Sequence, residues 1–310
     1  MSLSEPPRLP LGQLPTPLES IELSPGRRVW VKRDDLTGTA LTGNKVRKLE
    51  YLLADARAQG ATGVVTCGGI QSNHCRATAV AAAQLGLACH LFLRCDAPPP
   101  EDEPPTGNLK LDRLVGAEVT FISHQQYLNR HALMTAAAGP TGYVIPEGGS
   151  NALGTWGYLR CIDELLAQWD DPAPSALVCA TGSGGTHAGL AIGARRRELD
   201  IPVFGVAICD DGPTFQRRVA EISADVTARW PGLPQLAPAD VQVIEGYKGG
   251  GYAVSHPDEL SDIAAVARHT GLLLDPVYTG KAFRALIHKP GRFGPRPLFV
   301  HTGGIFGLLA

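Results

Sequence analysis

Residues 41–50 read Leu-Thr-Gly-Asn-Lys-Val-Arg-Lys-Leu-Glu, and this stretch predicts a loop that turns into a helix. Gly43 permits the turn, and Asn44 is a good residue to cap the first turn of a helix. Apolar residues then recur at helical spacing as far as Gly60, a common type of helix end: Val46, Leu49, Leu52, Leu53 and Ala56. One face of this helix is therefore expected to pack into a core.

Three cations, Lys45, Arg47 and Lys48, fall in the first turn of this helix. The N-terminus of a helix already carries partial positive charge, so each cation there costs roughly a few tenths of a kcal/mol. Two arrangements account for such cations: an anion that binds at the helix end, or a lysine that must lose its proton easily. The alternative is a basic helix start exposed to solvent.

The composition is that of an ordinary soluble globular protein. The chain has 310 residues, 44% of them hydrophobic and 19% charged, which allows about two domains. The 28 basic and 30 acidic residues give a formal charge of −2, so neither a nucleic acid nor a membrane is expected as a partner. The first residues do not resemble a signal peptide, and no apolar run approaches the ~18 residues needed to span a bilayer. We expect a cytoplasmic protein.

The seven cysteines suggest neither disulfides nor a metal site. They form no C-x-x-C pair and no Cys/His cluster with zinc-like spacing. Several lie in apolar runs, such as Cys67, Cys179 and Cys209, and are expected to be small buried residues. We therefore expect reduced cysteines and no bound metal.

Strand and helix patterns alternate along the chain, which is typical of an α/β fold with open, twisted parallel sheets covered by helices on both faces. The chain before residue 29 is expected to be extended, and the proline- and acid-rich residues 97–107 to form a surface loop. The expected strands are 29–32, 63–67, 88–93, 119–122, 143–145, 176–180, 203–208, 241–245 and 298–301. The helices expected after the first are 76–85, 109–115, 125–138, 153–168, 187–199, 214–229, 258–270 and 281–288.

The loop after strand 176–180 is typical of a phosphate site. Six small residues precede a helix there and leave backbone N–H groups accessible between hydroxyls: Thr181, Gly182, Ser183, Gly184, Gly185 and Thr186. The loop lacks the Gly-Lys-Ser/Thr of a Walker motif and the G-x-G-x-x-G dinucleotide fingerprint. A phosphate monoester therefore fits it better than a pyrophosphate. The alternative is a loop that is merely tight.

A second polar loop, residues 68–74, follows strand 63–67. It presents Gln71, Ser72, Asn73 and His74 at the carboxyl end of a strand, where open α/β sheets usually bind ligands. These residues could hold a substrate carboxylate. Ordinary capping of the next helix by Ser72 or Asn73 is the alternative.

Two tyrosines and one last loop complete the candidate residues. Tyr252 and Tyr278 lie in the loops 246–252 and 275–281, and a tyrosine can act as acid or base where a cation lowers its pKa. The alternative for each is packing or a structural hydrogen bond. The segment His-Thr-Gly-Gly at 301–304 follows the final strand, again at a carboxyl end.

Taken together, these segments resemble the family of D-cysteine desulfhydrases and 1-aminocyclopropane-1-carboxylate deaminases. Those are pyridoxal-phosphate enzymes with the fold of the tryptophan synthase β-subunit. The resemblance covers nearly the whole chain through residues 32–36, 43–50, 69–74, 146–151, 181–186, 275–281 and 301–304. It implies a large cofactor-binding domain of residues 1–47 and 156–310, a small domain of residues 48–155, and a homodimer.

The resemblance also implies roles for the residues already singled out. Lys45 matches the lysine that holds pyridoxal 5′-phosphate covalently, and Lys48 with Thr181 to Thr186 match ligands of its phosphate. Asn73 matches the residue bonded to the 3′-oxygen of the cofactor, and Ser72 the serine near the substrate carboxylate and α-carbon. Gln71 and His74 belong to the same substrate loop, and Tyr252 and Tyr278 match a pair of active-site tyrosines.

One position departs from the pattern of the deaminases. They carry a glutamate where Thr279 stands, and that acid contacts the pyridine nitrogen of the cofactor. Here Thr279 and Thr302 are the candidates for that contact, and neither is acidic. A hydroxyl leaves the ring unprotonated and a weaker electron sink. This suffices for β-elimination of D-cysteine to pyruvate, ammonia and sulfide, and suits opening of a cyclopropane less well.

Other functions stay open on the same residues. They are 1-aminocyclopropane-1-carboxylate deaminase, a sulfo-lyase acting on cysteate, and a catalytically silent protein that binds the cofactor or an amino acid. Intact Lys45, Ser72 and both tyrosines argue against the silent protein. A nucleotide-binding enzyme of another α/β class is disfavoured because the dinucleotide fingerprint is missing.

Overall fold

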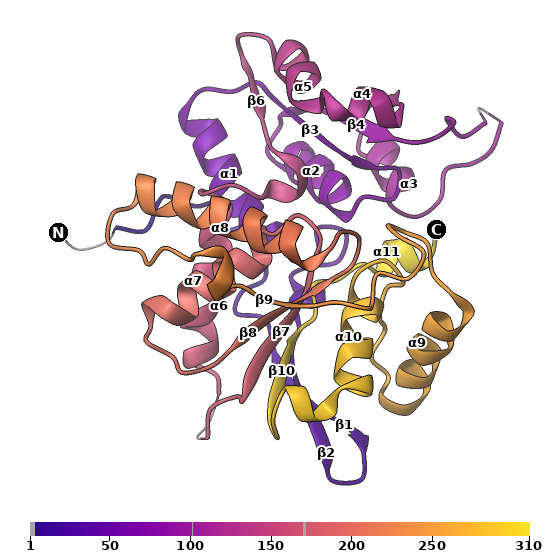
Figure 1. Cartoon of the computed structure of the whole chain (residues 1–310). Helices are drawn as coiled ribbons and strands as arrows, with labels where there is room; N and C mark the ends of the chain where they lie inside the picture. Colours follow the sequence, from indigo (N-terminus) through magenta and orange to yellow (C-terminus); the bar gives the residue numbers. More distant parts are fainter. Residues whose placement is uncertain (1–3, 101, 170–171) are drawn as a thin grey trace.

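The computed structural model describes residues 4–100, 102–169 and 172–310. Its strands form two sheets, each surrounded by helices (Figure 1). One sheet has six strands in the order β1-β2-β10-β7-β8-β9, and the other has four in the order β5-β4-β3-β6. This confirms the α/β architecture that the alternation of strands and helices predicts.

All neighbouring strands run parallel except β1 and β2. The strands are β1 (Leu18–Ser24), β2 (Arg27–Lys32), β3 (Gly63–Gly69), β4 (Ala88–Arg94), β5 (Glu118–Ile122), β6 (Gly142–Val144), β7 (Ala176–Thr181), β8 (Val203–Ala207), β9 (Gln242–Ile244) and β10 (Pro297–Val300). The helices are α1 (Lys45–Ala58), α2 (Asn73–Gln84), α3 (Gly107–Leu114), α4 (His124–Leu128), α5 (Arg130–Ala138), α6 (Trp156–Leu166), α7 (Gly185–Arg196), α8 (Gly212–Arg229), α9 (Pro257–Thr270), α10 (Thr279–His288) and α11 (Ile305–Leu308). Short 3-10 turns lie at Asp34–Leu36 (η1), Glu147–Gly149 (η2), Pro238–Asp240 (η3) and Pro290–Arg292 (η4).

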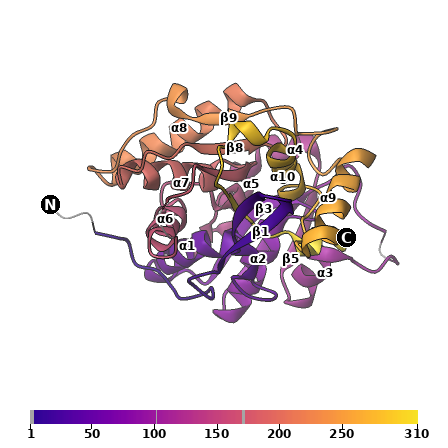
Figure 2. The same ribbon diagram turned by 90° about the horizontal axis from the view of Figure 1, so that it is seen from below.

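The hydrophobic runs of the central strands explain the layers of the larger sheet. Successive side chains of a strand point to opposite faces, so Val178 and Ala180 of β7 join the core against α9 and α10. Leu177 and Cys179 point the other way and pack against α6 and α7. Figure 2 shows α6, α7 and α8 on one side of the molecule and α9 and α10 on another. Burial on both faces is why these strands read as continuous apolar runs.

The smaller sheet is built in the same way. Val65 and Cys67 of β3 belong to the core formed with Met134 of α5, whereas Val64 belongs to the core formed with α1 and α2. The four strands of this sheet lie between Gly63 and Val144, in the upper part of Figure 1. The division into a domain of residues 48–155 and a larger one stays a prediction.

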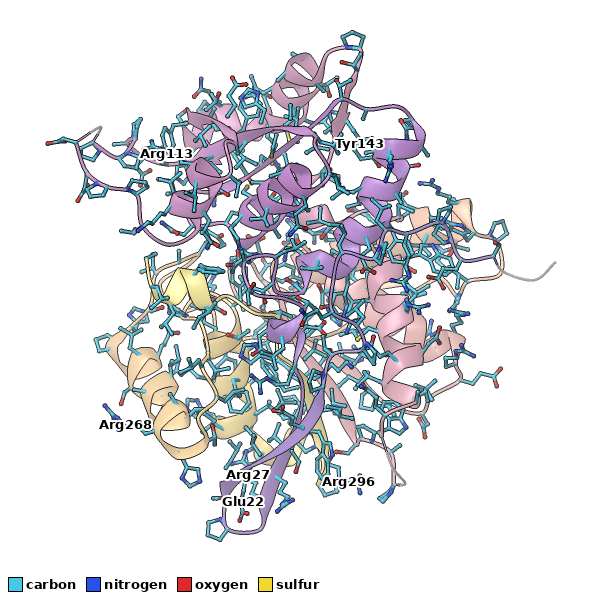
Figure 3. All side chains as sticks on the ribbon, turned by 180° about the vertical axis from the view of Figure 1, so that it is seen from behind. Glu22, Arg27, Arg113, Tyr143, Arg268 and Arg296 are labelled. Atoms are coloured by element: carbon cyan, nitrogen blue, oxygen red, sulfur yellow. The ribbon has the colours of Figure 1, made fainter. Side chains whose placement is uncertain are left out.

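The strand β1 was not predicted. It pairs antiparallel with β2 at the edge of the larger sheet, and none of its side chains is fully buried. An exposed edge strand lacks the apolar run that marks a central strand, so its residues read as merely extended. Glu22 and Arg27, labelled in Figure 3, belong to this peripheral hairpin.

Two predicted helices are shorter or divided. The segment 125–138 is split at Asn129, where α4 ends and α5 begins. The helix expected from residue 153 begins at Trp156, because Asn151 organises a turn in which its side chain accepts a hydrogen bond from the Gly154 N–H at 2.8 Å. This turn follows η2, from which Glu147 and Gly148 line the cavity described below.

No helix within the described residues is long and apolar enough to cross a membrane. The same part of the chain contains no group of three or more His, Cys, Asp or Glu side chains placed to hold a metal ion.

Candidate active site

A cavity of about 460 Å³ opens where the carboxyl ends of strands from both sheets meet. Loops after parallel strands of an α/β sheet are the usual place for a ligand. The wall includes residues at or just after the ends of β3, β4, β7, β8 and β10, namely Gly69, Arg94, Gly182, Asp210 and Thr302. Lys45, at the start of α1, completes it.

The loop before Lys45 is built to bring this lysine to the cavity. Gly43 adopts a positive φ of 94°, and a Cβ there would lie only 2.9 Å from the carbonyl oxygen of Thr302. The same carbonyl accepts a hydrogen bond from the Asn44 N–H at 3.1 Å. Arg76 of α2 donates to the carbonyls of Ala40 and Thr42 at 2.6 and 3.0 Å. The segment after β10 and helix α2 therefore fix the start of α1.

Lys45 holds an amine that loses its proton easily. Burial, helped by the positive charge of Arg76, lowers the pKa of Lys45 to about 8. Its Nζ donates to Asn44 Oδ1 at 3.1 Å. Asn44 occupies the predicted N-cap position of α1, but its side chain makes no capping hydrogen bond: its backbone is already helical, and its amide donates to Thr186 Oγ1 at 3.0 Å. Asn44 instead links the lysine to the loop after β7.

The other two cations of this turn have different partners. Arg47 is buried against Asp34 at 2.7 Å and Glu164 at 2.9 Å, and these carboxylates raise its pKa well above the ordinary value although burial opposes them. Lys48 is also buried, and its Nζ donates to Gly148 O at 3.1 Å and to Ser150 Oγ at 3.0 Å. Lys48 does not line the cavity, so this predicted phosphate ligand lies behind the wall and supports η2 and the residue that follows it.

The glycine-rich loop after β7 forms a cradle beside Lys45. Gly182, Ser183, Gly184 and Thr186 line the cavity, and Gly184 adopts a φ of +87° where α7 begins. The predicted ligands Thr181 and Gly185 do not line it. The hydroxyl of Thr181 is buried 3.4 Å from the ring of His187, and the Gly185 N–H donates to Ser150 Oγ at 3.2 Å.

This cradle fits a phosphate monoester. A Cβ on Gly185 would lie 2.8 Å from Lys48 Nζ and 2.6 Å from Ser150 Oγ, so the backbone must stay bare there. Ser150 Oγ also lies 2.8 Å from Ser183 Oγ, which joins the cradle to η2. Hydroxyls, backbone N–H groups and a helix N-terminus together favour an anion with several oxygens. Such an anion would place the rest of a cofactor next to Lys45.

The polar loop after β3 reaches the cavity through only some of the predicted residues. Ser72, Asn73 and His74 line the wall. Ser72 Oγ also accepts a hydrogen bond from the Cys75 N–H at 3.2 Å and so caps α2, which confirms the capping alternative without removing Ser72 from the site. Asn73 Oδ1 accepts from the amide of Asn108 at 3.1 Å.

Gln71 and His74 differ from what the sequence predicts for substrate ligands. Gln71 turns away from the cavity, because its amide donates to Thr106 O at 3.2 Å and its oxygen accepts from the Asn108 N–H at 2.7 Å. His74 lies 2.8 Å from Thr66 Oγ1, and burial together with Lys45 and Lys48 lowers its pKa well below the ordinary value. The imidazole is therefore neutral at physiological pH.

The two predicted tyrosines meet at the cavity. The Oη atoms of Tyr252 and Tyr278 are 2.7 Å apart, and the rings pack edge to face. Burial raises the pKa of Tyr252 to about 12 and that of Tyr278 well above its ordinary value. Both phenols keep their protons, so they can donate hydrogen bonds and do not serve as bases at neutral pH.

The structure separates the two threonines considered for the pyridine nitrogen. Thr279 is fully buried, and its hydroxyl donates to Asp275 Oδ1 at 2.6 Å and accepts from the Asp275 N–H at 2.8 Å. It does not line the cavity, so the structure gives no support to Thr279 as the candidate for the pyridine nitrogen, and that role stays a prediction. Thr302 does line the cavity.

Several wall residues were not predicted from the sequence. Arg94, Arg130 and Arg218 line the cavity, together with the carboxylates Glu147 and Asp210. Arg94 could have been found, because it ends a strand at the same sheet edge as the loop of Ser72. Arg130 and Arg218 lie within helices, where nothing in the sequence marks them.

Comparison with known proteins gives relatives over nearly the whole chain. A "Bifunctional D-cysteine desulfhydrase/1-aminocyclopropane-1-carboxylate deaminase, mitochondrial" of Arabidopsis thaliana is 42% identical over 96% of this chain and 78% of its own. A "D-cysteine desulfhydrase" of Yersinia enterocolitica is 40% identical over 99% of this chain and 97% of its own. A "Putative 1-aminocyclopropane-1-carboxylate deaminase" of Thermotoga maritima is 42% identical, covering 98% of each chain.

Solved structures and a family description agree with these relatives. The crystal structure of an "ACC deaminase homologue" matches with a TM-score of 0.86 and 35% identity over 98% of this chain and 94% of its own. The crystal structure of a threonine deaminase shares the fold, with a TM-score of 0.66 and 21% identity over 93% of this chain and 92% of its own. Residues 9–303 match the family "Pyridoxal-phosphate dependent enzyme". With Lys45 beside a phosphate cradle, the chain belongs to the pyridoxal-phosphate dependent enzymes.

Proposed function

We propose that this protein catalyses β-elimination of D-cysteine to pyruvate, ammonia and sulfide. Relatives at 40–42% identity over nearly the whole chain, which carry the names D-cysteine desulfhydrase and 1-aminocyclopropane-1-carboxylate deaminase, support the proposal. The wall of the cavity favours the first of these activities.

The observation that carries this choice is the hydroxyl of Thr302 at the cavity end of β10. Of the two candidates for the pyridine nitrogen, only Thr302 lines the cavity, and a hydroxyl cannot supply a full negative charge. The carboxylates of Glu147 and Asp210 also line it, but they lie 3.4 Å from Arg130 and Arg218. β-Elimination expels a good leaving group at once, so it needs less stabilisation of negative charge than opening a cyclopropane ring.

Residues of the cavity would hold the cofactor at both ends. Gly182, Ser183, Gly184 and Thr186 would bind its phosphate, and Lys45 would hold it covalently. When bound, pyridoxal phosphate supplies the electron sink that stabilises negative charge at the α-carbon of an amino acid.

The chain itself handles the substrate and its proton. The start of α2, with Ser72 and Asn73, presents a hydroxyl, an amide and backbone N–H groups that would orient the α-carboxylate. Lys45, with a pKa of about 8, is the base for the α-proton, since its amine is partly neutral near physiological pH. The protonated tyrosine pair would donate hydrogen bonds to developing negative charge.

Parallel product assays test the proposal. The purified protein, supplied with pyridoxal phosphate, is incubated with D-cysteine, L-cysteine and 1-aminocyclopropane-1-carboxylate, and sulfide, pyruvate and 2-oxobutyrate are measured. We expect equal amounts of sulfide and pyruvate from D-cysteine, and a specificity for it about 10³-fold above that for the cyclopropane, which corresponds to about 4 kcal/mol of barrier. Comparable rates on both would make the deaminase activity the better assignment.

The assembly is proposed on the resemblance, and the location on the sequence pattern. We infer a homodimer in the cytoplasm, and light scattering of the purified protein tests the first part. A monomeric mass at micromolar concentration would contradict it.

A further inference from the structure

Arg94 is a cation of the cavity wall that the proposed mechanism does not use. It is the last residue of β4, and its backbone is paired in register with Gly69, which ends β3. Gly69 leads directly into the loop of Ser72. The arginine therefore stands beside the expected carboxylate site and lines the same cavity.

The guanidinium lies close to two aromatic rings. Its Cζ is 4.6 Å from the centre of the Tyr127 ring and 5.6 Å from that of Tyr252. Contacts with ring faces hold an arginine through its charge and its flat surface, and they leave its N–H donors available. One of the rings belongs to the tyrosine pair, so Arg94 reaches the part of the cavity where the chemistry is proposed.

In the part of the chain that the structure describes, Arg94 has no carboxylate partner to neutralise its charge, whereas the other two arginines of the cavity wall each have one. Arg130 pairs with Glu147, and Arg218 pairs with Asp210, each at 3.4 Å. Within the described residues, no carboxylate lies within 4.0 Å of the guanidinium of Arg94, and its N–H groups make no hydrogen bond to the protein. A half-buried guanidinium with free donors on a cavity wall is suited to an anion of the ligand.

We propose that Arg94 forms the subsite for the β-substituent of the substrate and selects amino acids whose β-substituent carries or develops negative charge. The start of α2 already offers N–H groups for the α-carboxylate, so a second cation on this wall has a second negative group to bind. In β-elimination the bond between Cβ and sulfur breaks, and its electron pair leaves with the sulfur as hydrosulfide. Arg94 stabilises that charge. The identity of the leaving group rests on the proposed function, whereas the binding site for an anionic β-substituent does not.

Binding of two amino acids of nearly equal shape tests the subsite without turnover. Aspartate carries a β-carboxylate and asparagine a neutral amide, and both enantiomers are titrated into the holoenzyme while its visible spectrum is followed. We expect aspartate to bind about tenfold or more tighter than asparagine, since a charge-assisted hydrogen bond distinguishes them. Arg94→Met should abolish this preference, and Arg94→Lys should restore part of it. Arg113→Met, which replaces an exposed arginine outside the cavity wall, is the matched control and should keep the preference.

Two substrates with different leaving groups test the catalytic part. Chloride leaves 3-chloro-D-alanine without help, whereas sulfide needs its charge stabilised. Arg94→Met should lower kcat/KM for D-cysteine by about tenfold or more and leave that for the chloro compound within about threefold. Arg94→Gln serves if the methionine variant fails to fold. Equal losses on both substrates, or no preference for aspartate in the native protein, would overturn the inference. Retention of the aspartate preference without sulfide release would instead reject the proposed function.

Discussion

Lys45 shows how a single position can be chosen for its chemistry at a cost to the helix it begins. Its ammonium is disfavoured by burial and by Arg76, and no carboxylate forms a salt bridge with it among the described residues. Arg47, two positions on, has the buried carboxylate of Asp34 and the partly buried carboxylate of Glu164 as partners. The turn thus keeps one lysine ready to lose its proton and neutralises its neighbour.

This difference predicts how the protein without cofactor takes up pyridoxal phosphate as the pH changes. Only the neutral amine attacks an aldehyde, and the fraction of neutral Lys45 rises with pH until its pKa of about 8 is passed. The uptake rate, followed by visible absorbance, should therefore rise about tenfold per pH unit below that point and level off above it. With an ordinary exposed lysine, the uptake rate would continue to rise up to about pH 10. A plateau only at such alkaline pH would contradict the account.

The direction of each side chain limited how well the cavity residues could be predicted from the sequence. The sequence placed Ser72, Asn73, Tyr252, Tyr278 and Thr302 in loops, and all five line the cavity. Others in the same loops do not, because a local partner takes each of them. Gln71 is held by Thr106 and Asn108, and Thr279 by Asp275, and periodicity carries no information about such contacts.

At the scale of the element, α10 organises the tyrosine pair. Asp275 accepts hydrogen bonds from the N–H groups of Tyr278 and Thr279, each at 2.8 Å, and so holds Tyr278 where the helix begins. Lys281 lies in the first turn of the helix. Its Nζ donates to the carbonyls of Lys248, Gly251 and Val254 at 2.7, 2.6 and 3.1 Å, which fixes the loop that carries Tyr252.

Lys281→Met should therefore lower both stability and activity, although Lys281 does not line the cavity. Removing the ammonium leaves three partly buried carbonyls without their charged donor and should cost about 1–3 kcal/mol of unfolding free energy. Tyr252 should lose its position as well, so kcat on D-cysteine falls while pyridoxal phosphate remains bound at Lys45. Denaturant unfolding and kinetics measure the two effects.

A double-mutant cycle separates positioning from general destabilisation. If Lys281 acts through Tyr252, adding Tyr252→Phe to Lys281→Met should lower kcat no further than the larger single effect. Fully additive losses would show that Lys281 affects catalysis by another route.

Elements with a buried face were predictable, and those without one were not. The central strands read as apolar runs because helices cover both of their faces, as for β7 and β8. The edge strand β1 has no fully buried side chain, and the break at Asn129 depends on local geometry. Sequence patterns report burial, so they identify the core elements and miss the peripheral ones.

At the scale of the whole molecule, a buried ionic cluster ties together segments that lie far apart in the sequence. Arg47 of α1 binds Asp34, just after β2, and Glu164 of α6, which also forms a salt bridge with Lys32 at 2.5 Å. Burial alone would raise the pKa of Asp34, but Arg47, Tyr158 and Lys32 lower it overall, so the carboxylate stays charged. Its central residue, Arg47, follows Lys45 by two positions, so the cluster anchors the start of α1 to the larger sheet.

This long-range pairing could not be deduced from the sequence. No local sequence pattern links residues 34 and 164. The three cations in the first turn of α1 cannot be told apart by sequence, because their partners come from distant segments. What the sequence did convey was the common edge: loops after parallel strands gather at one place whatever the details of packing. The phosphate cradle and Lys45 meet there, as that rule predicts.

Borohydride reduction of the holoenzyme, followed by peptide mapping, tests most directly the claim that the molecule is organised around Lys45. Three other lysines are buried, namely Lys32, Lys48 and Lys281, but carbonyl, hydroxyl or carboxylate oxygens already engage each of their amines. We predict a single reduced pyridoxyl group on the peptide that contains Lys45, and none in a Lys45→Ala variant. A label on Lys48 or any other lysine, or a native protein that takes up no cofactor, would contradict the account.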